Sequence, residues 1–357
     1  MRDARRIVPS LIAAAVALAL VLGGCGGGSS GDDRPSSSAS RSVPATTSAA
    51  PTTEPPTTPA PPPAPAVNPL TGLEGVPAGP VIAAKIDDTA PARPQIGIDA
   101  ADVVYIEQAE GGLTRLVAVY ASQKPEIGPV RSVRASDPEL LAQYGGIAIV
   151  ASGGAGHALE AIANSSLVDA QYGAVPSAYY RSGSRYAPYN VIADLAALSG
   201  AVQAGGAKDV GFQWSAADPR LAPAPAAGRV HTAVGNTAVS FTYDGATNRF
   251  VRVINGQAQV AASGAPVSTP NVLIQFCQVA PDYDDVDVNG SPSTYTSTLG
   301  AGRAVLFRDG HYLDGTWSRA TLDAPTTFIA ADGQPFLLNP GGVWVVLAGS
   351  TAPLTVG

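Results

Sequence analysis

Apolar and polar residues divide the chain into three parts with different patterns. After a basic start, residues 7–22 form one apolar run. Residues 26–67 have no periodicity and consist mainly of Gly, Ser, Thr, Ala and Pro, a composition that cannot form a hydrophobic core. From residue 68 to the end, short apolar runs alternate with turn residues. This pattern predicts a folded part that follows a disordered segment.

The first half of the folded part mixes the signals of strands and helices. Short apolar runs predict strands at 81–86, 102–107, 113–122 and 147–151. Helical signals predict helices at 138–144, 157–164 and 191–202. Pro138 suits a first helical turn, Gly145 suits a helix end, and Asn190 is expected to cap the third helix. The alternation of strands and helices predicts an α/β domain over residues 68–205.

The second half of the folded part has the signals of an antiparallel β domain. Residues 206–229 are rich in Gly, Ala and Pro, and we interpret them as an interdomain connection, although Phe212 and Trp214 suggest that it packs against a domain. Hairpin-type pairs then recur at Asp244-Gly245, Asn255-Gly256, Asn289-Gly290, Asp309-Gly310, Asp314-Gly315 and Asp332-Gly333. Residues 230–357 are therefore predicted to form an antiparallel β domain with a core of its own.

The N-terminus has the pattern of a bacterial lipoprotein signal. Arg2, Arg5 and Arg6 precede the apolar run, which ends in Leu22-Gly-Gly-Cys25. We therefore predict a signal peptide at 1–24, lipidation of Cys25 and a tether at 25–67. The run is short for a membrane span, and several acyl chains on Cys25 would anchor the protein stably. The predicted location is the outer face of the cytoplasmic membrane, with the lipid anchor as the contact with the membrane.

Charge excludes one class of partner and points to another. The formal charge is −7, and it becomes −9 after cleavage because residues 1–24 carry three Arg and one Asp. Such an acidic chain argues against binding to nucleic acid. Lys occurs only at 85, 124 and 208, so nearly all positive charge is Arg, which suits bidentate contacts to carboxylate or phosphate.

Several of these arginines lie at predicted strand ends and helix starts. Arg131, Ser132 and Arg134 precede the Pro138 helix, where backbone N–H groups and the helix dipole favour an anion. Ser152, Gly153 and Gly154 follow a strand and add bare N–H groups. The full set predicted to line an anion site is Glu107, Arg115, Arg131, Ser132, Arg134, Ser152, Gly153, Gly154, Arg181 and Arg185. The alternative is structural: these arginines pair with Glu107, Glu110 and Glu139 to hold loops together.

Signals of catalysis or metal binding are weak. Ser152 lacks the nucleophile-elbow motif, and His157, His231 and His311 have no metal-ligand spacing. Asp285 opens a calcium-like motif, but Thr296 stands where the bidentate Glu would be. The sequence therefore identifies no catalytic residue, no metal site and no cofactor. Cys277 lies in an apolar run and is interpreted as a small buried hydrophobic residue.

Several segments together resemble the YerB-like bacterial lipoproteins, which are built from two adjoining domains of unknown function. The matching segments are Asn68-Pro-Leu-Thr-Gly72, Ala92-Arg-Pro-Gln95, Ala101-Asp-Val-Val-Tyr105, Glu110-Gly-Gly-Leu-Thr-Arg115, Ile127-Gly-Pro-Val-Arg-Ser-Val-Arg134, Arg185-Tyr-Ala-Pro-Tyr-Asn190, Gly315-Thr-Trp317, Pro325-Thr-Thr-Phe328 and Leu338-Asn-Pro-Gly341 with Trp344. The resemblance implies an envelope lipoprotein of two domains and brings no activity. Tyr189 and Ser152 stand where relatives are expected to carry His, so His-based chemistry would be missing here.

These observations favour one function class and leave a second open. The favoured class is a noncatalytic, membrane-anchored lipoprotein that binds an anionic envelope ligand: a glycan, a phospho-polymer or a partner protein. The alternative is a cell-envelope hydrolase or transferase that acts on a phosphodiester or glycosidic bond, with Glu107 and Glu110 as candidate carboxylates.

Overall fold

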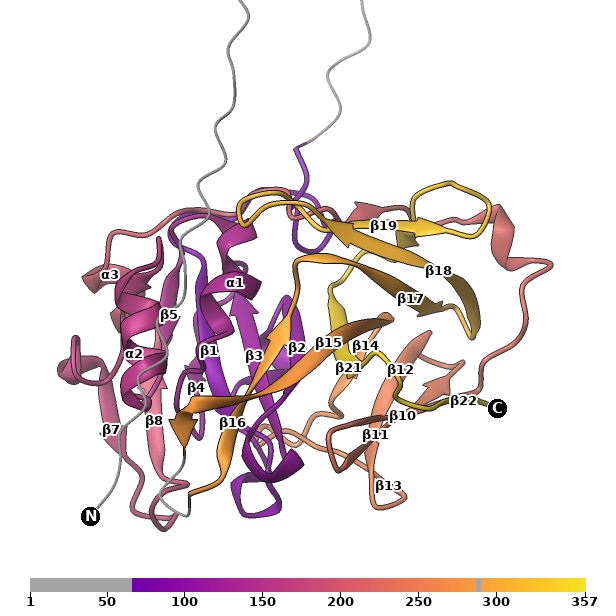
Figure 1. The fold of residues 1–357 in the computed structure, drawn as a ribbon. Coiled ribbons are helices and arrows are strands. Elements are labelled where there is room, and N and C mark those ends of the chain that lie inside the picture. The colour runs from indigo at the N-terminus through magenta and orange to yellow at the C-terminus, as the bar shows by residue number, and fades with distance from the viewer. Residues whose placement is uncertain (1–65, 287–289) are drawn as a thin grey trace, which may run out of the picture. The chain divides into compact units, whose positions relative to one another are not determined.

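The computed structural model describes residues 66–286 and 290–357 (Figure 1). The predicted signal peptide, Cys25 and all of the tether before residue 66 lie outside these residues, as does the Asn289 turn. None of the described helices has the length and the apolar character needed to cross a membrane.

A mixed sheet of 11 strands forms the centre of the folded part. In spatial order its strands are β19 (Thr327–Ala330), β18 (His311–Arg319), β17 (Gly300–Arg308), β15 (Asn271–Val286), β21 (Val343–Gly349), β2 (Val103–Gln108), β3 (Thr114–Tyr120), β1 (Ile82–Asp87), β5 (Ala148–Val150) and β6 (Val168–Asp169), with β16 (Pro292–Ser297) paired to β15. The four strands predicted in the first half are therefore present as β1, β2, β3 and β5.

Strand β21 joins the two halves of the chain. It pairs in parallel with β2 on one side and with β15 on the other, in the register Val104↔Trp344 and Ile274↔Val346. Both β2 and β21 are apolar on both faces, which is typical of strands inside a parallel sheet. The expectation that each half has a core of its own is therefore wrong, because the first half leaves the edge of β2 open for a strand from the second. The boundaries 68–205 and 230–357 stay predictions.

Alternation along the central strands assigns their side chains to two cores. Ile82, Ala84 and Ile86 of β1 lie in one core together with Phe241 and Phe250 of a second sheet. Their neighbours Val81 and Ala83 lie in the other core, which includes residues of α1 (Asp137–Leu141) and α2 (Gly156–Ala163). The central sheet is thus covered on both faces, as a sheet that contains parallel strands requires.

The second half is built from strands. Its own six-stranded sheet consists of β13 (Gln257–Ala258), β12 (Arg249–Ile254), β11 (Thr237–Asp244), β10 (Arg229–Val234) and β22 (Leu354–Val356) in spatial order, with β14 (Ser268–Thr269) paired to β12. Figure 1 shows β10–β13 grouped at the opposite side of the view from the helices. The all-β expectation for this half agrees with the described residues.

Two of the expected hairpin turns show what glycine provides. Asn255-Gly256 and Asp309-Gly310 have positive φ at both residues and connect β12 to β13 and β17 to β18. The turn expected at Asp314-Gly315 is wrong, because both residues lie inside β18. Gly315 is needed there for a different reason: a Cβ atom would lie 2.1 Å from the carbonyl oxygen of Ile329 on β19.

The first half contains fewer helices than an α/β domain normally has. Helices α1 and α2 lie where they were expected, and the turn η4 (Ala142–Tyr144) completes the first of them. The expected third helix begins late: residues 191–194 form strand β8 (Val191–Asp194), and α3 (Leu195–Ala201) follows. Asp194, not Asn190, caps α3, since its Oδ1 accepts from the N–H groups of Ala196 and Ala197. The α/β description therefore holds only in part.

Short elements complete the fold. A three-stranded sheet consists of β4 (Glu126–Ile127), β8 and β7 (Tyr179–Arg181), and β9 (Gln213–Trp214) pairs with β20 (Leu337–Leu338). Single 3-10 turns lie at η1 (Ala90–Ala92), η2 (Ile98–Ala100), η3 (Glu110–Gly112), η5 (Pro176–Ala178) and η6 (Pro219–Leu221).

The predicted connection packs against both halves. Trp214 donates from Nε1 to the carbonyl oxygen of Pro69 at 2.8 Å, and the ring of Phe212 stacks on that of Phe328. Its aromatic residues are therefore structural.

Candidate functional site

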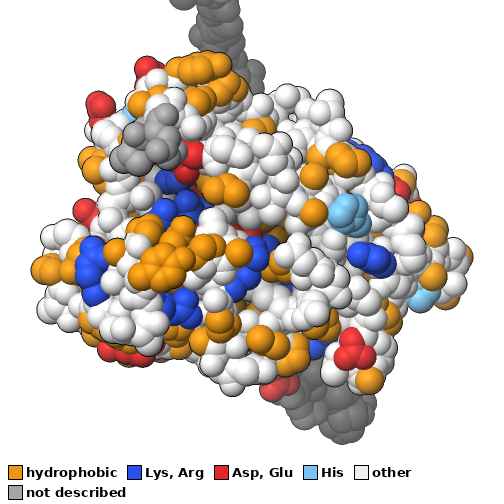
Figure 2. All heavy atoms as spheres, turned by 90° about the horizontal axis from the view of Figure 1, so that it is seen from below, with side chains coloured by type: hydrophobic (Ala, Val, Ile, Leu, Met, Phe, Trp, Pro, Cys, Tyr) orange, Lys and Arg blue, Asp and Glu red, His pale blue; other side chains and the backbone are white. Residues whose placement is uncertain are grey.

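Three of the predicted arginines line a single cavity of about 770 Å³, which we call the arginine cavity. Arg115 lies near the start of β3, and Arg131 and Arg134 lie in the loop between β4 and α1. Ser132 and Gly154 also line it. On the face shown in Figure 2, several Lys and Arg side chains gather in one half, and acidic side chains lie mostly near the edge.

Backbone hydrogen bonds bring these segments together. The N–H of Arg131 donates to the carbonyl of Lys85 at 2.9 Å, and the N–H of Ser152 donates to the carbonyl of Arg131 at 3.0 Å. The N–H of Val133 donates to the carbonyl of Gly153 at 2.9 Å. The loop that carries the arginines therefore lies between the end of β1 and the residues that follow β5. Consecutive elements of a fold are usually adjacent in space in this way.

Carboxylates lie close to the arginines of the cavity. Asp87 Oδ2 lies 3.1 Å from Arg115 Nη1 and 3.0 Å from Arg131 Nε, and Arg134 pairs with Glu110. Burial alone would raise the pKa of Glu110, but the charge of Arg134, hydrogen bonds to the carboxylate and the charge of Arg115 together outweigh it, and the pKa is lowered. Asp285 also lines the cavity, and burial raises its pKa. Three guanidinium groups thus lie close to three carboxylates, of which the pKa is lowered at Glu110 and raised at Asp285.

Some polar atoms beside the cavity have no hydrogen-bond partner among the described residues. They include Nε of Arg115, Nε of Arg134, Oγ1 of Thr89 and Oδ2 of Asp285. Arg115 and Arg134 are only 4% exposed. Burying donors without acceptors costs free energy, and an anion bound in the cavity would offset part of that cost.

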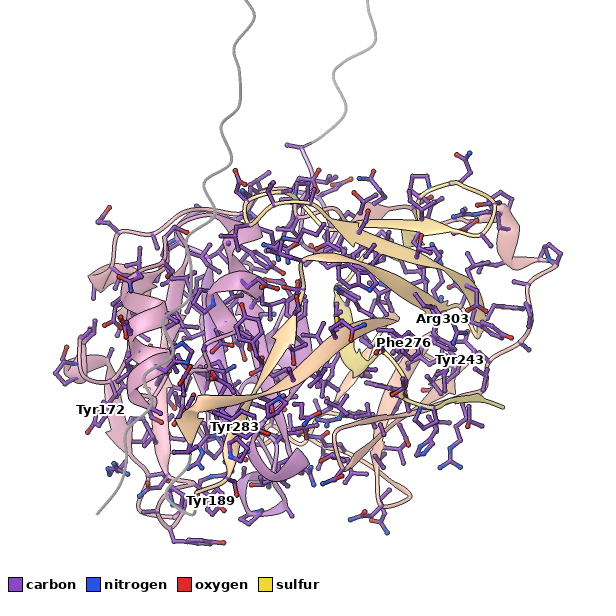
Figure 3. The ribbon with its side chains drawn as sticks, in the orientation of Figure 1. Tyr172, Tyr189, Tyr243, Phe276, Tyr283 and Arg303 are labelled. Carbon is purple, nitrogen blue, oxygen red and sulfur yellow. The ribbon has the colours of Figure 1, made fainter. Side chains whose placement is uncertain are left out.

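Tyr189 adds an aromatic ring to the rim. It lines the cavity, and the guanidinium carbon of Arg131 lies 5.7 Å from its ring centroid, within the range of a cation–π contact. In Figure 3 Tyr189 lies at the lower edge of the view. The tyrosine ring thus gives Arg131 a planar face to stack on.

The structure does not bring all of the predicted residues to this cavity. Arg181 donates to Asn190 Oδ1 at 2.8 Å and is exposed, and Arg185 donates to the carbonyls of Ala92 and Pro94. Ser152 and Gly153 support the loop through their backbones and are not among the lining residues. Arg185 therefore holds loops together, as the structural alternative expects. Arg115, Arg131 and Arg134 form ion pairs and also line the cavity.

Glu107 has a role that sequence reasoning missed. It was expected to line the anion site or to pair with the arginines there, and Arg115 is its neighbour across β2 and β3. Instead it is buried and bound to the amino group of Lys85, whose Nζ also lies 2.6 Å from Asp137 Oδ1. Lys85 is fully buried in an apolar strand. A lone lysine in an apolar run of the sequence indicates a buried acidic partner, and this pattern could have identified the role of Glu107.

A second cluster was also missed. One ligand atom from each of His157, Asp282 and Asp284 lies within 4.8 Å of the others, a spacing that a metal ion could bridge. Hydrogen bonds inside the cluster already account for this arrangement: His157 Nδ1 lies 3.1 Å from Asp282 Oδ2, and the Asp284 N–H donates to Asp282 Oδ1. His157 comes from α2 and the aspartates from β15, so no local spacing could have revealed them.

Known proteins resemble this chain over both halves. Residues 70–208 match the N-terminal domain, and residues 229–345 the C-terminal domain, of a protein family of unknown function, DUF3048. The chain is 27% identical over 292 residues to the "Putative lipoprotein YerB" of Bacillus subtilis (strain 168), covering 78% of this chain and 84% of that protein. The crystal structure of the Bacillus subtilis YerB protein covers 81% of this chain and 99% of its own, with a TM-score of 0.67 and 22% identity. At that identity the structural match shows the fold alone. The resemblance drawn from the sequence segments is confirmed.

Proposed function

This chain belongs to the DUF3048 family, and we propose that it is a lipid-anchored extracytoplasmic protein that binds an anionic envelope ligand without transforming it. The observation that carries the proposal is the convergence of Arg115, Arg131 and Arg134 on one cavity, where Nε of Arg115 and Nε of Arg134 have no hydrogen-bond partner among the described residues. Hydrogen bonds between guanidinium groups and an anion contribute about 1.5–3 kcal/mol each.

The lipid anchor rests on Leu22-Gly-Gly-Cys25 after a basic, apolar leader, and the name of the Bacillus relative supports it. Replacing Cys25 with Ala should leave the precursor unprocessed or release the protein from the membrane. Cell fractionation and the mass of the mature chain measure this. Normal processing and membrane retention of Cys25→Ala would contradict the lipid anchor. Accessibility of the protein to protease only from the cytoplasmic side would contradict the extracytoplasmic location.

Anion binding is best tested at Arg131. Its side chain is 26% exposed, so its loss should disturb folding less than loss of the buried Arg134, which also donates to two backbone carbonyls. We expect Arg131→Ala to weaken the binding of inorganic phosphate and of isolated envelope glycopolymers about tenfold or more, because one charged contact is lost. Titration calorimetry of the full chain measures the affinities, and circular dichroism checks the fold.

Arg181→Ala is the matched control, because this arginine lies in the same half of the chain but outside the cavity. It should bind as the wild type does. Equal weakening by both substitutions would mean that surface charge, and not the cavity, attracts anions. Release of free sugar or phosphate from the bound polymer over time would show that the protein transforms its ligand.

A further inference from the structure

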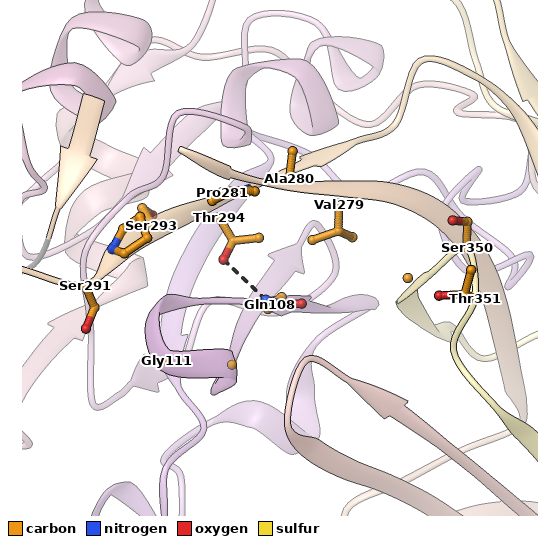
Figure 4. Close-up of a pocket in the computed structure, with 13 residues that line it drawn as sticks. Gln108, Gly111, Val279, Ala280, Pro281, Ser291, Ser293, Thr294, Ser350 and Thr351 are labelled. Atoms are coloured by element: carbon orange, nitrogen blue, oxygen red, sulfur yellow. Dashed lines mark hydrogen bonds between the residues drawn. The ribbon is translucent and has the colours of Figure 1, made fainter. Parts of the chain in front are cut away.

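A second cavity, of about 510 Å³, adjoins the arginine cavity, and we call it the hydroxyl groove. It lies between the turn η3, the paired strands β15 and β16, and the turn after β21. Gly111 and Ser291 line both cavities. Figure 4 shows Ser291 at one end of the groove and Ser350 and Thr351 at the other. The groove therefore begins at the arginine cavity and leads away from it.

The chemistry of the groove differs from that of its neighbour. None of the described residues that line it is charged. Its polar side chains are the amide of Gln108 and hydroxyls, including those of Ser293, Thr294, Ser350 and Thr351. Hydroxyls and amides both donate and accept hydrogen bonds, which matches a neutral ligand that is rich in hydroxyls. A charged ligand segment would find no opposite charge in this lining.

The floor of the groove is held in place from below. The carbonyl of Gly112 accepts from the N–H of Asn236 at 2.8 Å and from the hydroxyl of Thr237 at 3.1 Å. A Cβ atom on Gly112 would lie 2.5 Å from Asn236 Nδ2, so the turn packs closely on the β10–β11 connection. A binding surface that is already ordered loses less conformational entropy when a ligand binds.

Glu110 connects the two cavities. Its Oε2 pairs with Arg134 in the arginine cavity, and its Oε1 accepts from the hydroxyl of Ser293 in the groove at 3.2 Å. A ligand that reaches from one cavity to the other passes the Glu110 carboxylate. The two partners of this carboxylate, Arg134 and Ser293, are themselves side chains that could bind the ligand.

We propose that the hydroxyl groove binds the neutral sugar part of a ligand whose anionic group lies in the arginine cavity. The ligand class is then an acidic saccharide, phosphorylated or carboxylated. This inference rests on the proposed function, since it needs an anion in the arginine cavity. A peptide is the competing ligand class, because Val279, Ala280, Pro281 and Pro292 add apolar surface to the lining, and the test below includes it.

The test compares four kinds of probe with the full chain in detergent micelles. They are inorganic phosphate, a panel of phosphorylated and carboxylated oligosaccharides, the matched neutral oligosaccharides, and acidic peptides. We expect at least one acidic oligosaccharide to bind tenfold or more tightly than phosphate and than its neutral counterpart. Ser350→Trp should abolish this gain and leave phosphate binding unchanged, because Ser350 is exposed at the far end of the groove. Thr327→Trp, an exposed position on β19 that lines neither cavity, is the control.

Each outcome decides the matter. If phosphate binds but no saccharide gains more than about threefold over it, the sugar subsite is refuted and the proposed function stands. If neither phosphate nor any saccharide binds, both proposals fall. If acidic peptides bind more tightly than the saccharides and Ser350→Trp weakens them, the groove binds peptides and the sugar inference is wrong.

Discussion

Lys85 shows how one residue can shape the electrostatics of a core. Its amino group is fully buried and contacts two carboxylates, those of Glu107 and Asp137. One positive charge between two negative ones leaves a surplus negative charge in a buried region. A proton is the simplest way to remove it. Burial raises the pKa of Glu107 from 4.5 to about 7, and the nearby Asp137 acts in the same direction, against the charge of Lys85.

This raised pKa predicts a specific dependence of stability on pH. Between about pH 4.5 and pH 7 the folded protein holds a proton on Glu107 that the unfolded chain has released. The free energy of unfolding should therefore fall as the pH rises through this window, by up to about 1.4 kcal/mol per pH unit for one proton. Glu107→Gln cannot titrate and should flatten this fall. Urea unfolding between pH 4.5 and pH 7.5 measures it.

Glu74→Gln is the control for that experiment, because Glu74 is exposed and outside the core. Its pH dependence should match that of the wild type. If Glu107→Gln loses stability with pH as steeply as the wild type does, Glu107 does not hold the proton.

At the scale of elements, local sequence predicts structure where the decisive contacts are also local. Helix α1 was foreseen from Pro138 and its glycine stop, and the arginines before it were foreseen as a cluster. Strand β8 was not foreseen, because Val191 and Ile192 pair with β7, about ten residues earlier, and therefore form a strand in place of the expected helix. Tyr189 and Asp285 likewise reach the arginine cavity from distant segments, and no spacing in the sequence connects them to Arg131.

Gly315 offers a test at this scale, because its hairpin-like sequence lies inside a strand. We expect Gly315→Ala to destabilise the protein by about 1–3 kcal/mol, since the new methyl group would overlap the backbone of β19. Gly173→Ala should be nearly neutral, because a Cβ atom there meets no atom within 4 Å. Thermal unfolding of both variants measures the difference. Equal stability of the two variants would mean that β19 does not lie against β18 as described.

At the scale of the whole folded part, the order of strands explains why two sequence domains share one structure. Strand β21 comes from near the C-terminus, yet it lies between β2 and β15 and pairs with both. Composition and turn spacing describe each half separately. They do not indicate which strand of the second half pairs with the edge strand of the first half. The two family domains are therefore units of sequence whose central sheet is complete only when both are present.

This arrangement predicts that neither half folds well alone. A fragment of residues 66–208 would expose the edge of β2, an apolar strand with unpaired backbone groups, and should aggregate or lack a cooperative unfolding transition. Co-expression with residues 209–357 should restore a soluble complex, because a break after Lys208 cuts no strand or helix. Co-purification and calorimetry of the pair measure this, and the uncut chain is the reference. A sharp transition from residues 66–208 alone would contradict the shared sheet, because an independent core needs no strand from the other half.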